Sequence, residues 1–490
     1  MASRRIDVAG ESRPRMPPLH LIATGALLAV WAILFIIGLR RYPGSSEHYV
    51  VFSLAFLAML VSGLYKRTTY AYLFLVVFLW LGFWLKLTAH QIVLYPFGEP
   101  VGMFDNSPTA WDKVLVIATS GCMGVIAARF IYGWTNLKST LTSVERPSAP
   151  SWYPRMQKVL WPALVVVLTG CAILNAVYGI QQSGLVPRTL LIWPLNAAIY
   201  WMLGSGFAMC VATLGWWHLA SRSTVGPAAY LVLAASAMST VSLLSRGLYI
   251  FHTLPAMLAI CMNRARAEDL TLKRVSLFLA VFIGMMLVSL SLVSVLRGYY
   301  YSNVPPALTG LTDTATSMRG ARASLRFIVD RWVGVEGVMA VSSYHDKGPG
   351  LFFSALTEKS EIGKSSLYQD ICLAHYRFMD MSKFQFASLP GAIAFFYYTG
   401  SLLLVMLGMM VLTLIALCSE KVVSRLTANP FLSAFWGCGM ANLIAQFGVA
   451  PRGLAPHFVM SSLAILTIWS VQSNWFAGML CRRGLRPPDA

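Results

Sequence analysis

Four arginines fall within one short stretch of an otherwise apolar chain. The segment TSMRGARASLRFIVDRW, Thr316–Trp332, contains Arg319, Arg322, Arg326 and Arg331. A guanidinium group matches phosphate oxygens in a bidentate fashion and keeps its charge when it is partly buried. The stretch therefore predicts a binding site for a phosphate or diphosphate group.

Helical spacing divides the four arginines into two groups. Positions i, i+3 and i+7 share one helix face, so Arg319, Arg322 and Arg326 form a stripe that Asp330 extends. Arg331 lies about 120° from Arg319 around the axis. Apolar side chains gather on the adjoining arc, which is typical of an amphipathic helix on a membrane surface. We expect the stripe to bind substrate as a unit and Arg331 to act separately.

Other basic residues lie at the same predicted depth. Lys86 occurs about one turn inside a predicted span, in FWLKLTAH, and Arg246 lies between two spans, in LLSRGL. Arg188, Arg297 and Arg452 also fall at or near span ends. Any one of these cations could be an anchor that reaches lipid phosphates. As a set they favour a site for a lipid-linked diphosphate, with Lys86 and Arg246 among its binding residues.

Carboxylates and histidines of the same side are candidate proton acceptors. Glu336, in WVGVEGVM, lies between glycines and apolar residues, and such surroundings raise the pKa of a carboxyl group. His345, in SSYHDKG, is a second candidate base because imidazole titrates near neutrality. Glu99, in FGEPVG, and His90 belong to a shorter loop, where Glu99 is a candidate substrate contact. Solvated or ion-paired loop residues are the simpler alternative for each.

The composition indicates a membrane protein that positions these residues with helices. The chain has 490 residues, of which 57% are hydrophobic and 12% charged, and a mean hydropathy of +0.64. Soluble domains carry about 25% charged residues. Apolar runs of about 20 residues predict an all-α bundle of about twelve membrane spans. The predicted spans are 18–39, 49–65, 70–90, 114–133, 159–180, 196–219, 226–244, 247–263, 275–296, 392–417, 431–449 and 457–479.

Lys and Arg are concentrated in alternate short loops, which predicts that both termini are cytoplasmic. The large loop 298–391 then faces the opposite side, and we expect it to contain amphipathic helices. The predicted organisation is spans one to nine over 1–297, the loop over 298–391, and spans ten to twelve with a cytoplasmic tail over 392–490.

Several classes of site have no motif in the chain. There is no P-loop, no GxGxxG after a strand and no CxxC, so we expect neither a nucleotide cofactor nor a structural metal. The net charge of +19 is consistent with anionic lipid at the cytoplasmic face, and we expect no nucleic-acid partner.

Three segments resemble bacterial O-antigen and exopolysaccharide repeat-unit polymerases of the Wzy type. TVSLLSRGLYIFHTLP, Thr240–Pro255, resembles the paired spans of that family joined by a Ser-Arg turn, which would put Arg246 in the site. The arginine-bearing segment resembles the family's large loop. FASLPGAIAFFYYTGS, Phe386–Ser401, resembles its Pro-Gly return into the next span.

The resemblance implies a metal-independent glycosyltransferase of the GT-C type in the bacterial inner membrane. The substrates would be undecaprenyl-diphosphate-linked oligosaccharides, and a chain-length regulator and a flippase of the same pathway would be further partners. O-antigen ligases share the layout but carry a His-Asn pair in the loop, whereas Asp346 follows His345 here. A ligase and a lipid-linked oligosaccharide transporter or flippase remain alternatives to a polymerase.

Overall fold

The computed structural model describes residues 19–65, 69–94, 96–135, 149–192, 194–222, 226–262, 271–301, 329–359, 361–375, 379–448 and 451–473. Within these ranges the chain is mostly helical, and the strands β1 (Gly184–Leu185) and β2 (Phe384–Gln385) form one small antiparallel sheet.

The long helices follow the apolar runs of the sequence. They are α1 Leu19–Arg41, α2 Ser46–Leu64, α3 Tyr70–Trp80, α5 Pro108–Thr135, α6 Tyr153–Tyr178, α8 Phe207–Arg222, α9 Gly226–Ser242, α10 Leu248–Met262, α11 Leu272–Tyr300, α18 Leu402–Thr427, α19 Pro430–Ala445 and α20 Leu454–Gln472. The π-helical turn η1 (Leu81–Leu85) joins α3 to α4 (Lys86–Val93), and a second π-helical turn, η3 (Met202–Gly206), joins α7 (Leu195–Trp201) to α8.

Length and composition identify these helices as a membrane bundle. Among the described residues, eight helices are long and apolar enough to cross a membrane. The helices α9, α10 and α19 are apolar but have only 15 to 17 residues. At 1.5 Å per residue they are roughly 23–26 Å long, somewhat less than a hydrocarbon core of about 30 Å. The predicted all-α membrane class is confirmed, while twelve spans stay a prediction.

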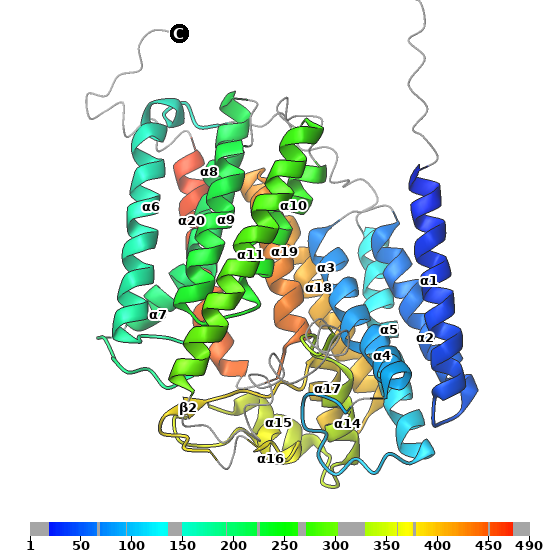
Figure 1. Ribbon diagram of the computed structural model, residues 1–490. Helices are drawn as coiled ribbons and strands as arrows, with labels where there is room; N and C mark the ends of the chain where they lie inside the picture. Colours follow the sequence, from blue (N-terminus) through cyan, green and yellow to red (C-terminus); the bar gives the residue numbers. More distant parts are fainter. Residues whose placement is uncertain are drawn as a thin grey trace, which may run out of the picture.

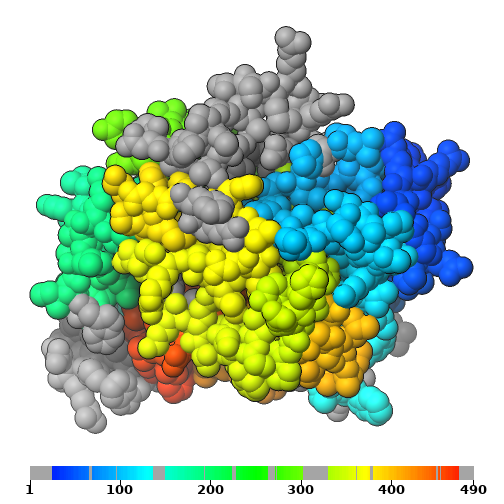
Figure 2. All heavy atoms as spheres, turned by 90° about the horizontal axis from the view of Figure 1, so that it is seen from below, coloured from blue at the N-terminus to red at the C-terminus, as the bar shows by residue number. Residues whose placement is uncertain are grey.

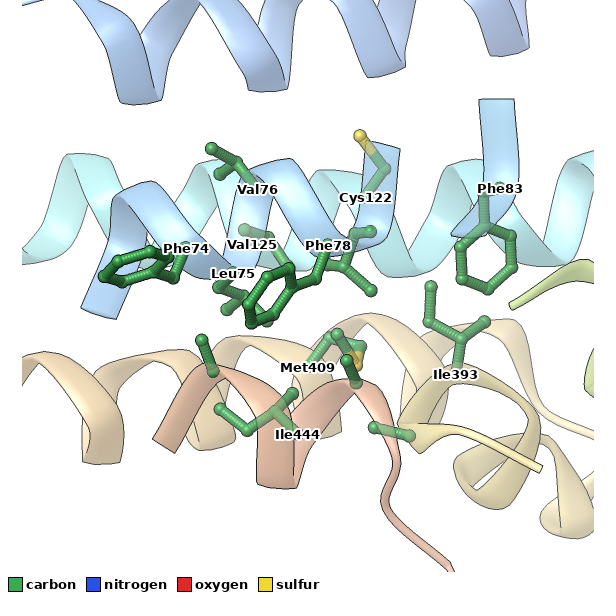
Figure 3. Close-up of a cluster of buried hydrophobic side chains, with 14 of the residues drawn as sticks. Phe74, Leu75, Val76, Phe78, Phe83, Cys122, Val125, Ile393, Met409 and Ile444 are labelled. Atoms are coloured by element: carbon green, nitrogen blue, oxygen red, sulfur yellow. The ribbon is translucent and has the colours of Figure 1, made fainter. Parts of the chain in front are cut away.

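Helix α3 lies at the centre of one half of the bundle and is almost wholly buried. It packs against α2, α18 and α19, and α5 lies between α2 and α18 (Figure 1). Figure 3 shows the side chains that fill this core, with Phe78 of α3, Val125 of α5 and Ile444 of α19 directed toward one another. The helices α6 to α11 form the other half, which α10 joins to α19.

The segment between α11 and α18 lies at one end of the bundle (Figure 1). It contains α14 (Val335–Ser343), α15 (Pro349–Thr357), α16 (Leu367–Ile371) and α17 (Ala392–Phe396). Seen from that end, its yellow atoms lie across the middle of the molecule (Figure 2). The β1–β2 pair joins it to the connection between α6 and α7. We call the end of the bundle at which this segment lies the loop end.

The predicted span 392–417 differs from the structure. Residues Ala392–Phe396 form the short helix α17, and the 3-10 turn η6 (Tyr397–Thr399) ends at Gly400, whose φ is +76°. A left-handed residue terminates a helix, so a new helix begins after it. Ser401 caps α18 by accepting a hydrogen bond from the backbone N–H of Leu404. The membrane helix therefore covers 402–427.

At the opposite end, Glu420 of α18 joins two helices that are distant in sequence. Its buried carboxylate accepts hydrogen bonds from the backbone N–H groups of Tyr70 and Ala71, at 2.8 and 2.6 Å. These N–H groups open α3, where a helix has no internal acceptors. Thr69, the residue before α3, makes no side-chain cap. Glu420 thus supplies the N-terminal cap of the central helix.

We expect Glu420→Ala to lower the free energy of unfolding by about 3 kcal/mol, because it leaves two buried backbone donors without their acceptor. The thermal midpoint of the purified protein in detergent, followed by size-exclusion chromatography, measures the loss. Glu47→Ala removes an exposed carboxylate from the first turn of α2 and should shift the midpoint little. Equal midpoints for both variants would contradict the capping role.

Candidate functional site

Two groups of charged side chains meet at the loop end. The carboxylate cluster comprises Lys86, His90, Glu99, Asp330 and Glu336. The arginine cluster comprises Arg246, Arg297 and Arg331, which interact electrostatically with one another. The clusters are joined through the consecutive residues Asp330 and Arg331, whose Cα atoms are about 3.8 Å apart across the peptide bond.

Lys86 is a buried cation whose bonds all go to the chain segment before and within α14. Its ammonium group forms an ion pair with Glu336, and the exposed fractions of the two side chains are only 1% and 3%. It also donates to the Trp332 carbonyl oxygen at 2.8 Å and to that of Asp330 at 3.4 Å. One carboxylate and two carbonyl oxygens therefore surround the buried ammonium group.

Local backbone geometry explains how this segment reaches Lys86. The π-helical turn η1 precedes Lys86. Such turns are rare in proteins, and those that occur are often found at functional sites. Gly82 of this turn faces Val333 and Gly334, and a Cβ atom on either glycine would overlap the other segment's backbone. Two facing glycines therefore permit the close approach. Gly337 makes a similar backbone contact with Pro390.

His90 and Asp330 form a second pair within the carboxylate cluster. His90 Nε2 lies 2.8 Å from Asp330 Oδ1, and the imidazole stacks on Phe97 with ring centroids 3.9 Å apart. His90 belongs to α4, one turn beyond Lys86, so the two side chains share a helix face. This pair fixes Asp330 and, through it, the position of Arg331.

Glu99 is the carboxylate of the cluster that is best suited to transfer a proton. Ser388 Oγ donates to Glu99 Oε2 at 3.1 Å. Burial, together with the negative charge of Glu336, raises the pKa of Glu99 to about 7, against the opposing effects of Lys86 and Ser388. At neutral pH the group is therefore present in both its acid and its base form.

The arginine cluster presents fixed positive charge beside these carboxylates. Arg297 donates to the Leu244 carbonyl oxygen from Nε at 2.9 Å and from the terminal guanidinium nitrogen at 2.6 Å. Burial, followed by repulsion from Arg297, lowers the pKa of both Arg246 and Arg331 to about 10. Both guanidinium groups stay charged at neutral pH, and they sit partly dehydrated, where an anion gains most from them.

The predicted site residues fall into three groups. Lys86, Glu99 and Glu336 lie together, and Arg246 lies with Arg331, so each group joins residues from distant parts of the sequence. His345 is exposed and lies beyond the C-terminal end of α14 at Ser343, whereas Glu336 lies in the first turn of that helix. The stripe of Arg319, Arg322 and Arg326 lies outside the described residues. The roles predicted for all of these side chains stay predictions.

Three further residues complete the two clusters. The sequence identifies His90 as a candidate proton acceptor and Asp330 as an extension of the arginine stripe, but nothing in their spacing indicates that they pair. Arg297 stands out in the sequence only as one of several arginines at span ends. Its site position depends on how α11 packs against α9. Among the described residues, no group of three or more His, Cys, Asp or Glu is placed to hold a metal ion.

Comparison of the chain with models of known families, with curated proteins and with solved structures found no match. The functional interpretation therefore depends on the residues of the site.

Stability measurements can test the structural role of the Lys86–Glu336 pair independently of any role in substrate binding. We expect Lys86→Met to lower the free energy of unfolding by about 3–5 kcal/mol, because Glu336 is left as an uncompensated buried charge. Adding Glu336→Gln should restore most of the loss. Thermal midpoints of the purified variants test this, and a double variant no more stable than Lys86→Met would contradict a coupled pair.

Proposed function

We propose that this protein is a glycan polymerase that transfers a growing polysaccharide from a polyisoprenoid diphosphate to a lipid-linked repeat unit. The observation that carries the proposal is the meeting of the arginine cluster and the carboxylate cluster at one end of a membrane bundle. A membrane enzyme with this function must hold a diphosphate leaving group and deprotonate an acceptor hydroxyl at the same membrane surface.

The arginine cluster suits the leaving group. As the sugar–oxygen bond breaks, negative charge develops on the diphosphate. Fixed cations aimed at that charge lower the barrier, and they do so most strongly where water is excluded. Arg246 and Arg331 are the partly dehydrated cations, and Arg297 adds a third charge beside them.

The carboxylate cluster suits the acceptor. In our proposal Glu99 accepts the proton of the attacking hydroxyl, because its pKa near 7 matches a base that works at neutral pH. Glu336 then has a positioning role, since its charge is paired with Lys86 and raises the pKa of Glu99. The earlier prediction of Glu336 as base is replaced by this assignment.

The proposed location is the bacterial inner membrane, with twelve spans, the loop end in the periplasm and both termini in the cytoplasm. Basic residues of the short connections support this orientation, because Lys and Arg favour the cytoplasmic side. Arg155, Arg222, Arg274 and Arg425 lie toward the ends of their helices that are remote from the loop end (Figure 1).

Deletion of the gene tests the proposal by the intermediate that accumulates. Lipid-linked single repeat units are the expected result. Long polymer that is not attached to its final acceptor would favour a ligase, and intermediates confined to the cytoplasmic leaflet would favour a flippase. Either of these outcomes would contradict polymerase activity.

Complementation of that deletion tests the diphosphate role of Arg246. Arg246→Lys should lose most polymerisation, because lysine cannot reproduce the two-pronged contact to phosphate. Arg452→Lys is the matched control, since Arg452 is an exposed loop-end arginine that contacts the Thr357 carbonyl oxygen. Polymer length on a gel is the measurement. Normal polymer with Arg246→Lys, at normal expression, would make Arg246 a lipid anchor.

The pH dependence of the reaction tests Glu99. A base acts in its deprotonated form, so the initial rate should rise about tenfold per pH unit below 7 and level off above it. Glu99→Gln should lower the rate about a hundred-fold or more and remove this dependence. Glu361→Gln changes an exposed loop carboxylate and should have no effect. An unchanged rate and profile with Glu99→Gln would assign the base elsewhere.

A further inference from the structure

An apolar groove runs along the outside of the bundle and ends beside the arginine cluster. Its walls are α6 and α11, and α9, which packs against both helices, forms its floor (Figure 1). Small side chains keep it open, among them Ala172, Ala176, Ala237, Ser242 and Gly284. Its volume of about 480 Å³ lies within the range of small-molecule ligand sites.

The groove opens toward the surrounding lipid. Ile173 of α6 and Val288 and Leu292 of α11 line it, and each is about half exposed or more. Among the described residues, no atom outside its own helix lies within 4 Å of the position that a Cβ atom would take on Gly284. From Gly284 to Leu292 the groove follows α11 for roughly 12 Å. An elongated apolar chain can therefore enter it from the side.

Two arginines stand at the loop end of the groove. Arg188 donates to the carbonyl oxygen of Ala176, a lining residue, at 3.3 Å, and its guanidinium lies 5.2 Å from the ring centroid of Tyr300 on α11. Arg297 donates to the carbonyl oxygen of Leu244, two residues beyond the lining residue Ser242. Carbonyl oxygens thus hold both guanidinium groups at this end of the groove.

We infer that this groove binds the hydrocarbon chain of a polyisoprenoid diphosphate, with Arg188 and Arg297 at its headgroup and the other two arginines of the arginine cluster, Arg246 and Arg331, next to them. The identity of the lipid rests on the proposed function. The apolar lining suits the chain, and several adjacent cations match a diphosphate better than the single charge of a phosphodiester.

The groove can be filled without disturbing the protein. Gly284→Trp places an indole in open space inside it, and Gly133→Trp on α5 is the matched control, because Gly133 also has open space around it. The probe is undecaprenyl diphosphate, added to the purified full-length protein and followed by native mass spectrometry. We expect Gly284→Trp to weaken binding tenfold or more, Arg188→Ala to weaken it several-fold, and Gly133→Trp to leave it unchanged.

Three outcomes would overturn the inference. Binding by Gly284→Trp equal to that of the wild type would show that the chain lies elsewhere. Equal binding of undecaprenol, which has no phosphate, would remove the role of the arginines. Equal competition by dioleoyl phosphatidylglycerol would make the groove a general lipid site. Each variant must elute as a single size-exclusion peak, so that a folding defect is not counted as lost binding.

The binding assay contains no glycan and no polymerisation step, so the two proposals can fail separately. Tight binding that depends on Gly284, in a protein whose deletion leaves polymer unchanged, would support the groove and contradict the polymerase. If deletion abolishes the polymer but Gly284→Trp leaves lipid binding unchanged, the polymerase proposal is supported and the groove is contradicted.

Discussion

The buried positive charge of Lys86 is the constraint around which the loop end is organised. A lone ammonium group inside a membrane bundle costs several kcal/mol, so it must be met by acceptors that are equally buried. The acceptors all come from residues 330–336, which are remote in sequence. The chain beyond α11 therefore has to return onto α4, and the glycines at 82 and 334 let the two backbones approach closely enough.

This return sets the electrostatics of the candidate site. Because Glu336 is held against Lys86, its negative charge lies near Glu99 and raises the pKa of that carboxyl. Because Asp330 is held by His90, the next residue, Arg331, is directed to Arg246 and Arg297. One short segment thus positions Glu99, whose pKa is about 7, and the arginine cluster at the same end of the bundle. Such a pairing is what transfer from a diphosphate donor requires.

The two halves of the bundle have different relations to lipid. The continuous helical span α3–η1–α4, Tyr70–Val93, is mostly buried, as is expected for a span that must present Lys86 to protein groups and not to hydrocarbon. The helices α6 and α11 leave most of their apolar side chains exposed. Their small residues face one another across α9, and the resulting groove points to the arginines. The half of the bundle around α3 is therefore closely packed, whereas α6 and α11 present their apolar side chains at the surface.

The sequence by itself determined the class of the protein and the approximate position of its helices, because the length of an apolar run is a local property. It also identified Lys86 as a charge inside a span and the arginines as a set at span ends. It failed at residues 392–401, where the left-handed residue Gly400 divides an apolar run into two helices. Only the tertiary structure decided which charges meet. Spacing along a chain gives the direction of a side chain around its own helix, as for the arginine stripe, but not its distance from another helix. For that reason Glu99 and Glu336 come together with Lys86 while His345, nine residues from Glu336, lies apart.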